Sequence, residues 1–281
     1  MDAAALSLLA MPLVACLILV GILAYLGIHV LARGVVFVDL ALAQVAALGT
    51  TVAFLTGHRL DGAVAYSYSL GFTFGAAGLF ALSRRLRARV PQEAMIGVAY
   101  VVAAAAAIVF VDKAPHGAEH LKYILVGNIL WVSAAEVLLL AVVCSAVGVF
   151  HFVFRNQLLA LSFDRDVADA RTLRAVAWDL AFYASFGVVI TTSVQLAGVL
   201  LVFACLIVPA VFAALFATRV AWRLVLSWAL GFLVAVTGIL ASYFLDLPTG
   251  AAVVATFGLA LLLALAVRVL WRRRAPAMAE G

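Results

Sequence analysis

Nine apolar segments separated by short polar loops dominate this chain and limit what it can fold into. A helix needs roughly 20 predominantly apolar residues to cross the hydrocarbon core of a bilayer. Only 11% of the residues are charged, whereas a soluble domain carries about a quarter. The pattern predicts an all-α fold, a polytopic membrane helical bundle. The segments lie near residues 6–31, 36–56, 63–83, 94–111, 131–153, 180–195, 196–217, 222–245 and 250–271.

The boundary between the sixth and seventh segments is the least distinct. Only the short polar stretch 191–195, with the sequence TTSVQ, separates them. The sequence therefore predicts eight or nine transmembrane helices, and the smaller count would include a re-entrant segment. It predicts a single transmembrane domain over residues 1–271, followed by a cytoplasmic tail over 272–281.

The basic residues predict how the chain lies in the membrane. Fifteen of the 18 fall in alternate loops, and the other loops hold only Arg59, Lys113 and Lys122. Because positive charge is retained on the cytoplasmic side, we expect the amino terminus outside and the carboxyl terminus in the cytoplasm. The basic surface is expected to meet anionic lipid headgroups and not nucleic acid. The fifteen are Arg33, Arg84, Arg85, Arg87, Arg89, Arg155, Arg165, Arg171, Arg174, Arg219, Arg223, Arg268, Arg272, Arg273 and Arg274.

Motifs for nucleotide binding and hydrolysis are missing from the sequence. It contains no GxxxxGK[ST], HExxH or GxSxG pattern, so the chain is predicted not to be an enzyme. Most acidic residues lie near the ends of the apolar segments, which disfavours a proton or sodium relay at the bilayer midplane. Any uphill transport would therefore draw its energy from a separate ATPase.

The loop over residues 158–174 is a candidate docking site for such a cytoplasmic partner. Ser162 or Asp164 could cap a short helix there, and Val167 and Ala168 would offer apolar contacts among alternating charges. A solvated amphipathic loop is the alternative interpretation.

Several short motifs occur in a fixed order along the chain. They are FVDLALAQ at 37–44, EAMIG at 93–97, LVGNIL at 125–130, FD at 163–164, GVLLV at 198–202 and PTG at 248–250. Each motif is weak alone, but their order and spacing together are specific. From about Gly27 to Val267 the chain resembles the metal-type permease family of ATP-binding-cassette importers, the ABC-3 family.

The resemblance implies a type II importer-like permease in the bacterial inner membrane. It implies a homodimer with cytoplasmic ATPase subunits and an extracytoplasmic metal-binding receptor, working by alternating access. The 158–174 loop would then be a coupling loop, with Phe163, Asp164, Val167 and Ala168 meeting the ATPase. The substrate would be a divalent metal, zinc or manganese, with no tightly bound cofactor. A permease for another small solute, or a stand-alone secondary transporter, remains an alternative.

The second apolar segment departs from the family pattern. The family usually has an Asp four residues before a His, but here these positions are Leu40 and Gln44. Asp39 lies one residue earlier and therefore about 100° around the helix. We take Asp39, Gln44 and His29 as candidate pathway residues. The alternatives are a first-turn acid favoured by the helix dipole for Asp39, an interhelical hydrogen bond for Gln44 and a hydrogen-bonded interior side chain for His29.

A second candidate metal site lies in the predicted external loop. If that loop is helical, His116, Glu119 and His120 fall at i, i+3 and i+4 on one face, a spacing suited to zinc-type ligands. A polar surface loop with incidental histidines is the alternative. Such ligands fit several divalent metals, so the sequence does not separate zinc from manganese.

Overall fold

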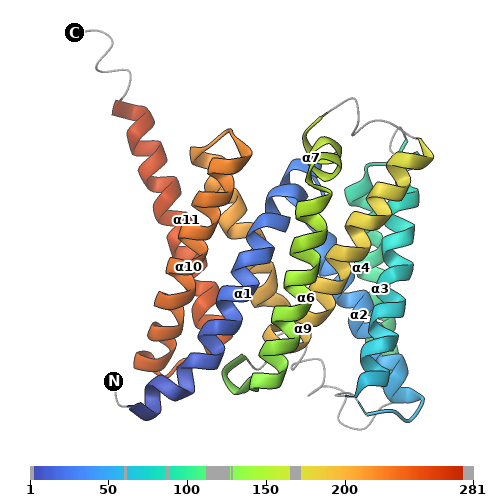
Figure 1. Ribbon diagram of the computed structural model, residues 1–281, viewed down its shortest axis with the longest axis horizontal. Coiled ribbons are helices and arrows are strands. Elements are labelled where there is room, and N and C mark those ends of the chain that lie inside the picture. The colour runs from blue at the N-terminus through green and yellow to red at the C-terminus, as the bar shows by residue number, and fades with distance from the viewer. Residues whose placement is uncertain are drawn as a thin grey trace.

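The computed structural model describes residues 3–59, 62–86, 89–111, 127, 129–164 and 172–274. Over these residues the chain is a bundle of helices without a strand, which confirms the predicted all-α class (Figure 1). Two short 3-10 turns, η1 (Arg84–Leu86) and η2 (Ile129–Trp131), accompany the α-helices. The α-helices are α1 (Ala3–Arg33), α2 (Val38–Leu55), α3 (Ala63–Ser83), α4 (Gln92–Val111), α6 (Ala134–Val153), α7 (Arg155–Phe163), α9 (Leu173–Phe216), α10 (Val220–Leu245) and α11 (Thr249–Arg274).

The longest helix, α9, is two membrane crossings joined at a sharp break. Its 44 residues would extend about 66 Å as one straight helix, about twice the thickness of the hydrocarbon core. Gly198 interrupts it with φ 77° and ψ 159°, and Figure 1 shows the helix turning back at its lower end. The sixth and seventh predicted segments are therefore the two arms of α9.

Two motifs far apart in the sequence meet at this break. A Cβ atom on Gly127 would lie 2.2 Å from the carbonyl carbon of Ala197 and 2.3 Å from the nitrogen of Gly198. Gly127 also has a positive φ of 67°, which side-chain-bearing residues rarely adopt. The backbone at 127 can thus reach the turn of α9 only because both positions are glycine.

Seven helices in the described part of the chain are long and apolar enough to span a bilayer, with α9 counted once. α3 is not among these seven. Its 21 residues would extend about 31 Å, and this helix runs beside α2 and α4 (Figure 1). With the two arms of α9 counted separately, the apolar crossings number eight, and whether α3 is a ninth stays a prediction.

Hydroxyl groups explain why α3 is less apolar than the other crossings. The Tyr66 hydroxyl lies 2.8 Å from Thr192 Oγ1, and Thr73 Oγ1 lies 3.0 Å from Thr191 Oγ1. Polar groups in a bilayer need partners inside the protein because lipid tails offer none. The polar face of α3 is therefore bonded to the first arm of α9.

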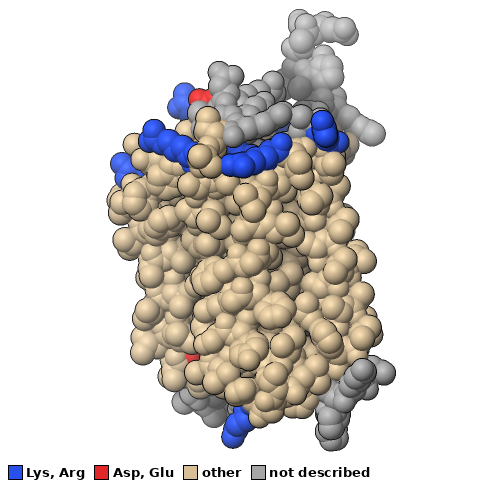
Figure 2. Space-filling view, turned by 90° about the vertical axis from the view of Figure 1, so that its right-hand side faces the viewer, with Lys and Arg blue, Asp and Glu red and all other residues tan. Residues whose placement is uncertain are grey.

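Positive charge is concentrated at one end of the bundle. Figure 2 shows a band of Lys and Arg side chains along the upper rim and little basic charge at the opposite end. The carboxyl-terminal end of α11 lies at this basic end, and the start of α1 lies at the other (Figure 1). The described basic residues thus segregate as the alternating loops predict.

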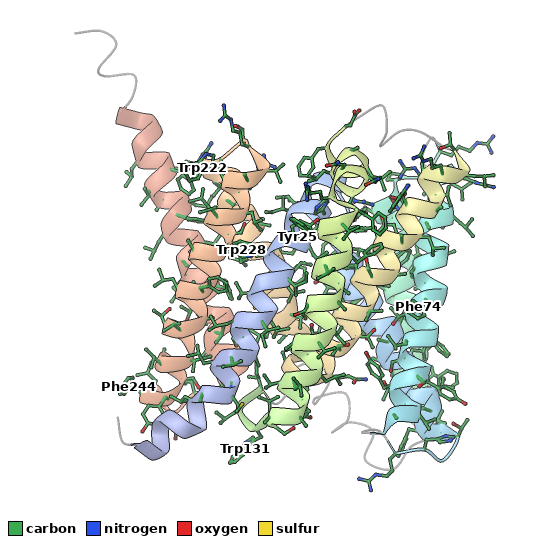
Figure 3. The ribbon with its side chains drawn as sticks, in the orientation of Figure 1. Tyr25, Phe74, Trp131, Trp222, Trp228 and Phe244 are labelled. Carbon is green, nitrogen blue, oxygen red and sulfur yellow. The ribbon has the colours of Figure 1, made fainter. Side chains whose placement is uncertain are left out.

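Aromatic side chains mark both ends of the crossings. Figure 3 shows Trp222 near the basic end and Trp131 and Phe244 near the opposite end, and all three are exposed on this single chain. Tryptophan is enriched where a membrane meets water. The position of these rings agrees with a bundle that spans a bilayer between them.

A glycine sets the distance between α1 and the second arm of α9. A Cβ atom on Gly27 would lie 1.9 Å from the carbonyl oxygen of Leu206, so the two backbones touch at this position. Small residues allow such close approach of membrane helices, where packing and not water exclusion drives association.

Replacing Gly27 by alanine should separate these helices. We expect Gly27→Ala to destabilise the purified protein by about 1–3 kcal/mol, the usual cost of an overpacked site, measured as a lower thermal unfolding temperature in detergent. Gly21→Ala is the matched control, because nothing lies within 4 Å of a Cβ atom there. Equal stability of the two variants would contradict the close contact.

Candidate permeation and coupling site

Asp39 is an interior residue of the single subunit. It lies in the first turn of α2 and is only 2% exposed. The neighbouring Glu93, at the start of α4, accepts a hydrogen bond from the Phe37 backbone N–H at 3.1 Å, which helps to hold the start of α2. The helix dipole favours a carboxylate in the first turn. This position therefore agrees with the alternative role proposed for Asp39 from the sequence.

Leu40 and Gln44 occupy the face of α2 where the resemblance implies an acid and an imidazole. Both are partly exposed, whereas Asp39 is buried. Since Gln44 carries an uncharged amide with one acceptor oxygen and two donor hydrogens, this face offers hydrogen bonds without a negative charge. Asp39 does not take over the place of the acid that the family pattern puts at position 40.

His29 is a hydrogen-bonded interior residue. It is fully buried, and its Nδ1 lies 2.8 Å from Ser162 Oγ. It packs against Tyr25, with 4.8 Å between ring centroids, and Figure 3 shows Tyr25 in the half of α1 nearer the basic end. Its Nε2 has no hydrogen-bond partner among the described residues. The geometry agrees with the interior alternative for His29.

The candidate pathway residues Asp39, Gln44 and His29 stay predictions. Over the residues that the structure describes, no group of three or more His, Cys, Asp or Glu side chains is placed to hold an ion. The external candidates His116, Glu119 and His120 lie outside the described residues. That external site therefore stays a prediction.

The predicted docking loop begins with the short helix α7. Phe163 and Asp164 are exposed at its end, as a contact with a partner requires, whereas Val167 and Ala168 lie outside the described residues. Of the two predicted caps, Ser162 does not cap a helix, because α7 starts at Arg155 and Ser162 lies in its last turn. The other predicted cap, Asp164, stays a prediction, because the residues that follow it lie outside the described part of the chain.

The most tightly held charges lie where α7 meets the bundle. Asp179 in α9 is fully buried, and Arg33 Nη1 at the end of α1 donates to its Oδ1 at 2.8 Å. Arg84 of η1, itself 1% exposed, donates to the other oxygen, Oδ2. The Arg33 guanidinium also lies 3.8 Å from the centroid of the Phe182 ring. One carboxylate thus joins three parts of the chain.

Sequence reasoning missed this ion cluster. It used Arg33 and Arg84 only as markers of orientation and grouped Asp179 with the acids near segment ends. The available signal was an acid placed just inside an apolar segment, on the side where the basic loops gather. Such an acid requires a basic partner, because an unpaired charge in a membrane is costly.

Removing the charge of Asp179 should destabilise the fold strongly. Breaking a buried ion pair by changing one partner costs roughly 3–5 kcal/mol, since the other charge is left unpaired, and Asp179→Asn leaves two arginines in that state. We expect a large fall in thermal unfolding temperature. The control is Asp246→Asn, because Asp246 is exposed after α10 in the left-handed region at φ 52°, where Asn is tolerated. Similar stability of both variants would contradict the cluster.

The fold and its ends define a class of protein. Long apolar crossings and a basic end describe a polytopic membrane protein. Residues 5–268 match the model of the ABC 3 transport family. The chain belongs to this family and is a multi-pass membrane permease subunit of an ATP-binding-cassette transporter, not an enzyme.

Curated relatives cover most of the chain. A "Manganese transport system membrane protein MntC" of Listeria monocytogenes is 28% identical over 206 residues, 70% of this chain and 73% of its own. A "Probable iron transport system membrane protein" of Haemophilus influenzae is 25% identical over 236 residues, 83% of this chain and 80% of its own. The "Manganese import system permease protein ScaB" of Streptococcus gordonii is 27% identical over 252 residues, 86% and 85% of the two chains.

A solved structure shares the fold over nearly the whole length. The structure described as "PsaBC from Streptococcus pneumoniae in complex with Fab" matches with a TM-score of 0.74 and 24% identity. The match covers 93% of each chain. The arrangement of crossings seen here is therefore the arrangement of a known permease fold.

Proposed function

We propose that this chain is the permease of an importer for a divalent metal ion, manganese or zinc, driven by a separate ATPase. The observation that carries the proposal is the family match along almost the entire chain, supported by relatives named for manganese and iron transport. A second copy of the chain and an external metal-binding receptor would complete the assembly.

The basic end is proposed to face the cytoplasm, which places the amino terminus outside. The receptor would deliver the ion near the loops 58–61, 112–122 and 246–250. ATP-driven movement of the ATPases would press on the loop that starts with α7, and the permease would then open inward. An ATPase can shift this equilibrium only through contacts that differ between the two states.

The proposed orientation can be tested by thiol labelling of whole cells. We expect Arg85→Cys to resist an impermeant thiol reagent and His58→Cys to react with it, because these exposed positions lie at opposite ends of the bundle. The native Cys16, Cys144 and Cys205 are buried and should give little background. Labelling of Arg85→Cys from outside would reverse the topology.

A permease for another small solute is the second candidate, and Leu40 and Gln44 favour it. An apolar side chain and an amide replace the charged or imidazole ligands that hold a divalent metal most strongly. If the substrate is a metal, its selectivity must lie elsewhere, and the external loop offers a second ligand set.

The external histidines provide the test of the metal proposal. We expect His116→Ala with His120→Ala to lower uptake of radioactive manganese or zinc several-fold. Membrane insertion and binding of the ATPase should persist, because the change leaves α7 and the apolar segments untouched. A site on a transport route must also release its ion, so partial and not complete loss is expected.

Two controls accompany this assay: cells with the unchanged chain and cells that lack it. Metal uptake that falls on deletion but not in the double variant would make the external histidines incidental and keep the metal proposal. Equal uptake of both metals with and without the chain would favour the other-solute candidate.

A further inference from the structure

Ser162 links the docking helix to the membrane bundle. It lies in the last turn of α7 and is 6% exposed. Its hydroxyl oxygen is 2.8 Å from His29 Nδ1 and 2.8 Å from Arg33 Nε, both on α1. Over the described residues, Ser162 is the only side chain of α7 that hydrogen-bonds to another helix.

One bond of this group has a fixed direction. A guanidinium can only donate, so Ser162 Oγ accepts the hydrogen bond from Arg33 Nε. Between Ser162 Oγ and His29 Nδ1 the donor depends on the histidine tautomer, because the hydroxyl can donate its hydrogen or accept on its second lone pair. A single serine hydroxyl thus bonds to two groups on α1, and a buried group that lost it would be left unpaired.

Arg33 carries the connection further into the bundle. Its Nη1 donates to Asp179 Oδ1 of α9 at 2.8 Å, and Arg84 of η1 donates to Oδ2. Ser162, His29, Arg33, Asp179 and Arg84 therefore form one buried network, here called the Ser162 joint. Hydrogen bonds in such a low-dielectric interior are stronger than in water and polarise one another.

We propose that Ser162 is a positioning residue through which a displacement of α7 is transmitted to α1 and α9. The proposal rests on the proposed function, because it requires that an ATPase moves α7. The apolar contacts of α7, made by the buried Leu158 and Leu161, hold the helix in place but are not directional. The hydroxyl bonds are directional, so they can move α1 together with α7.

A second serine in the protein provides a matched control. Ser185 Oγ lies 2.9 Å from Nε2 of His151, a buried histidine whose ring centroid is 6.4 Å from that of His29. Ser185 belongs to α9 and not to α7. Ser185→Ala therefore removes the same kind of bond in the same region without disconnecting α7.

The test uses the permease with its ATPase and its external receptor in proteoliposomes and measures radioactive manganese or zinc moved per ATP hydrolysed. We expect Ser162→Ala to keep ATP hydrolysis and to lower this ratio several-fold. Ser162→Thr, which keeps the hydroxyl, should restore the ratio, and Ser185→Ala should leave it unchanged. Should Ser162→Ala not be recovered folded, Ser162→Cys fills the same space with a weakly bonding thiol and should lower the ratio likewise.

A second readout needs no metal. The labelling rate of Leu48→Cys, at a partly exposed position of α2, should change between nucleotide-free and ATP-bound complexes and lose this response in Ser162→Ala. A labelling response in the parent without movement of manganese or zinc would refute the proposed substrate. The labelling of Ser162→Ala alone would then decide whether the Ser162 joint transmits the movement. If Ser162→Ala moves as much metal per ATP as the parent, or keeps the parent's change in Leu48→Cys labelling, the proposed role of Ser162 is wrong.

Discussion

The pairing of Asp179 with Arg33 and Arg84 is the interaction on which the basic end of the bundle depends. Moving these charges out of water is expensive, and only good geometry with further hydrogen bonds repays that cost. The cluster meets this condition because both carboxylate oxygens are bonded and Arg33 makes a further bond to Ser162. As a result, the end of α1, the turn after α3, the start of α9 and the end of α7 are held in one arrangement.

The bilayer explains the remaining features of the fold. Since unsatisfied backbone groups are costly in lipid, the chain crosses as complete helices, and α9 breaks where Gly127 approaches Gly198. Side-chain hydroxyls inside the membrane follow the same rule, because Tyr66 and Thr73 are bonded to α9. Polar residues are thus used to fix one helix against another, and the lipid-facing surface stays apolar.

The fold was largely predictable from the sequence, but the site was not. Apolar length and alternating basic loops predicted the crossings and the segregation of charge, because both follow from the membrane itself. The contact of Arg33 with Asp179 spans 146 residues, and no local pattern specifies such a pairing. Serine and aspartate favour helix caps locally, so the sequence predicts a cap at Ser162 or Asp164, whereas a long-range contact with α1 determines the position of Ser162. The loss of the ligand pair at Leu40 and Gln44 was visible at once, since it is a departure from a motif and requires no tertiary contact.

We propose that the chain passes a metal ion under the control of an ATPase, and uptake of manganese or zinc into proteoliposomes tests this directly. The vesicles hold the permease, its ATPase and the external receptor, with and without ATP and with an ATPase that binds but cannot hydrolyse it. We expect uptake only with ATP hydrolysis and no effect of an imposed proton or sodium gradient. Uptake by the permease alone, driven by such a gradient, would contradict the proposed function.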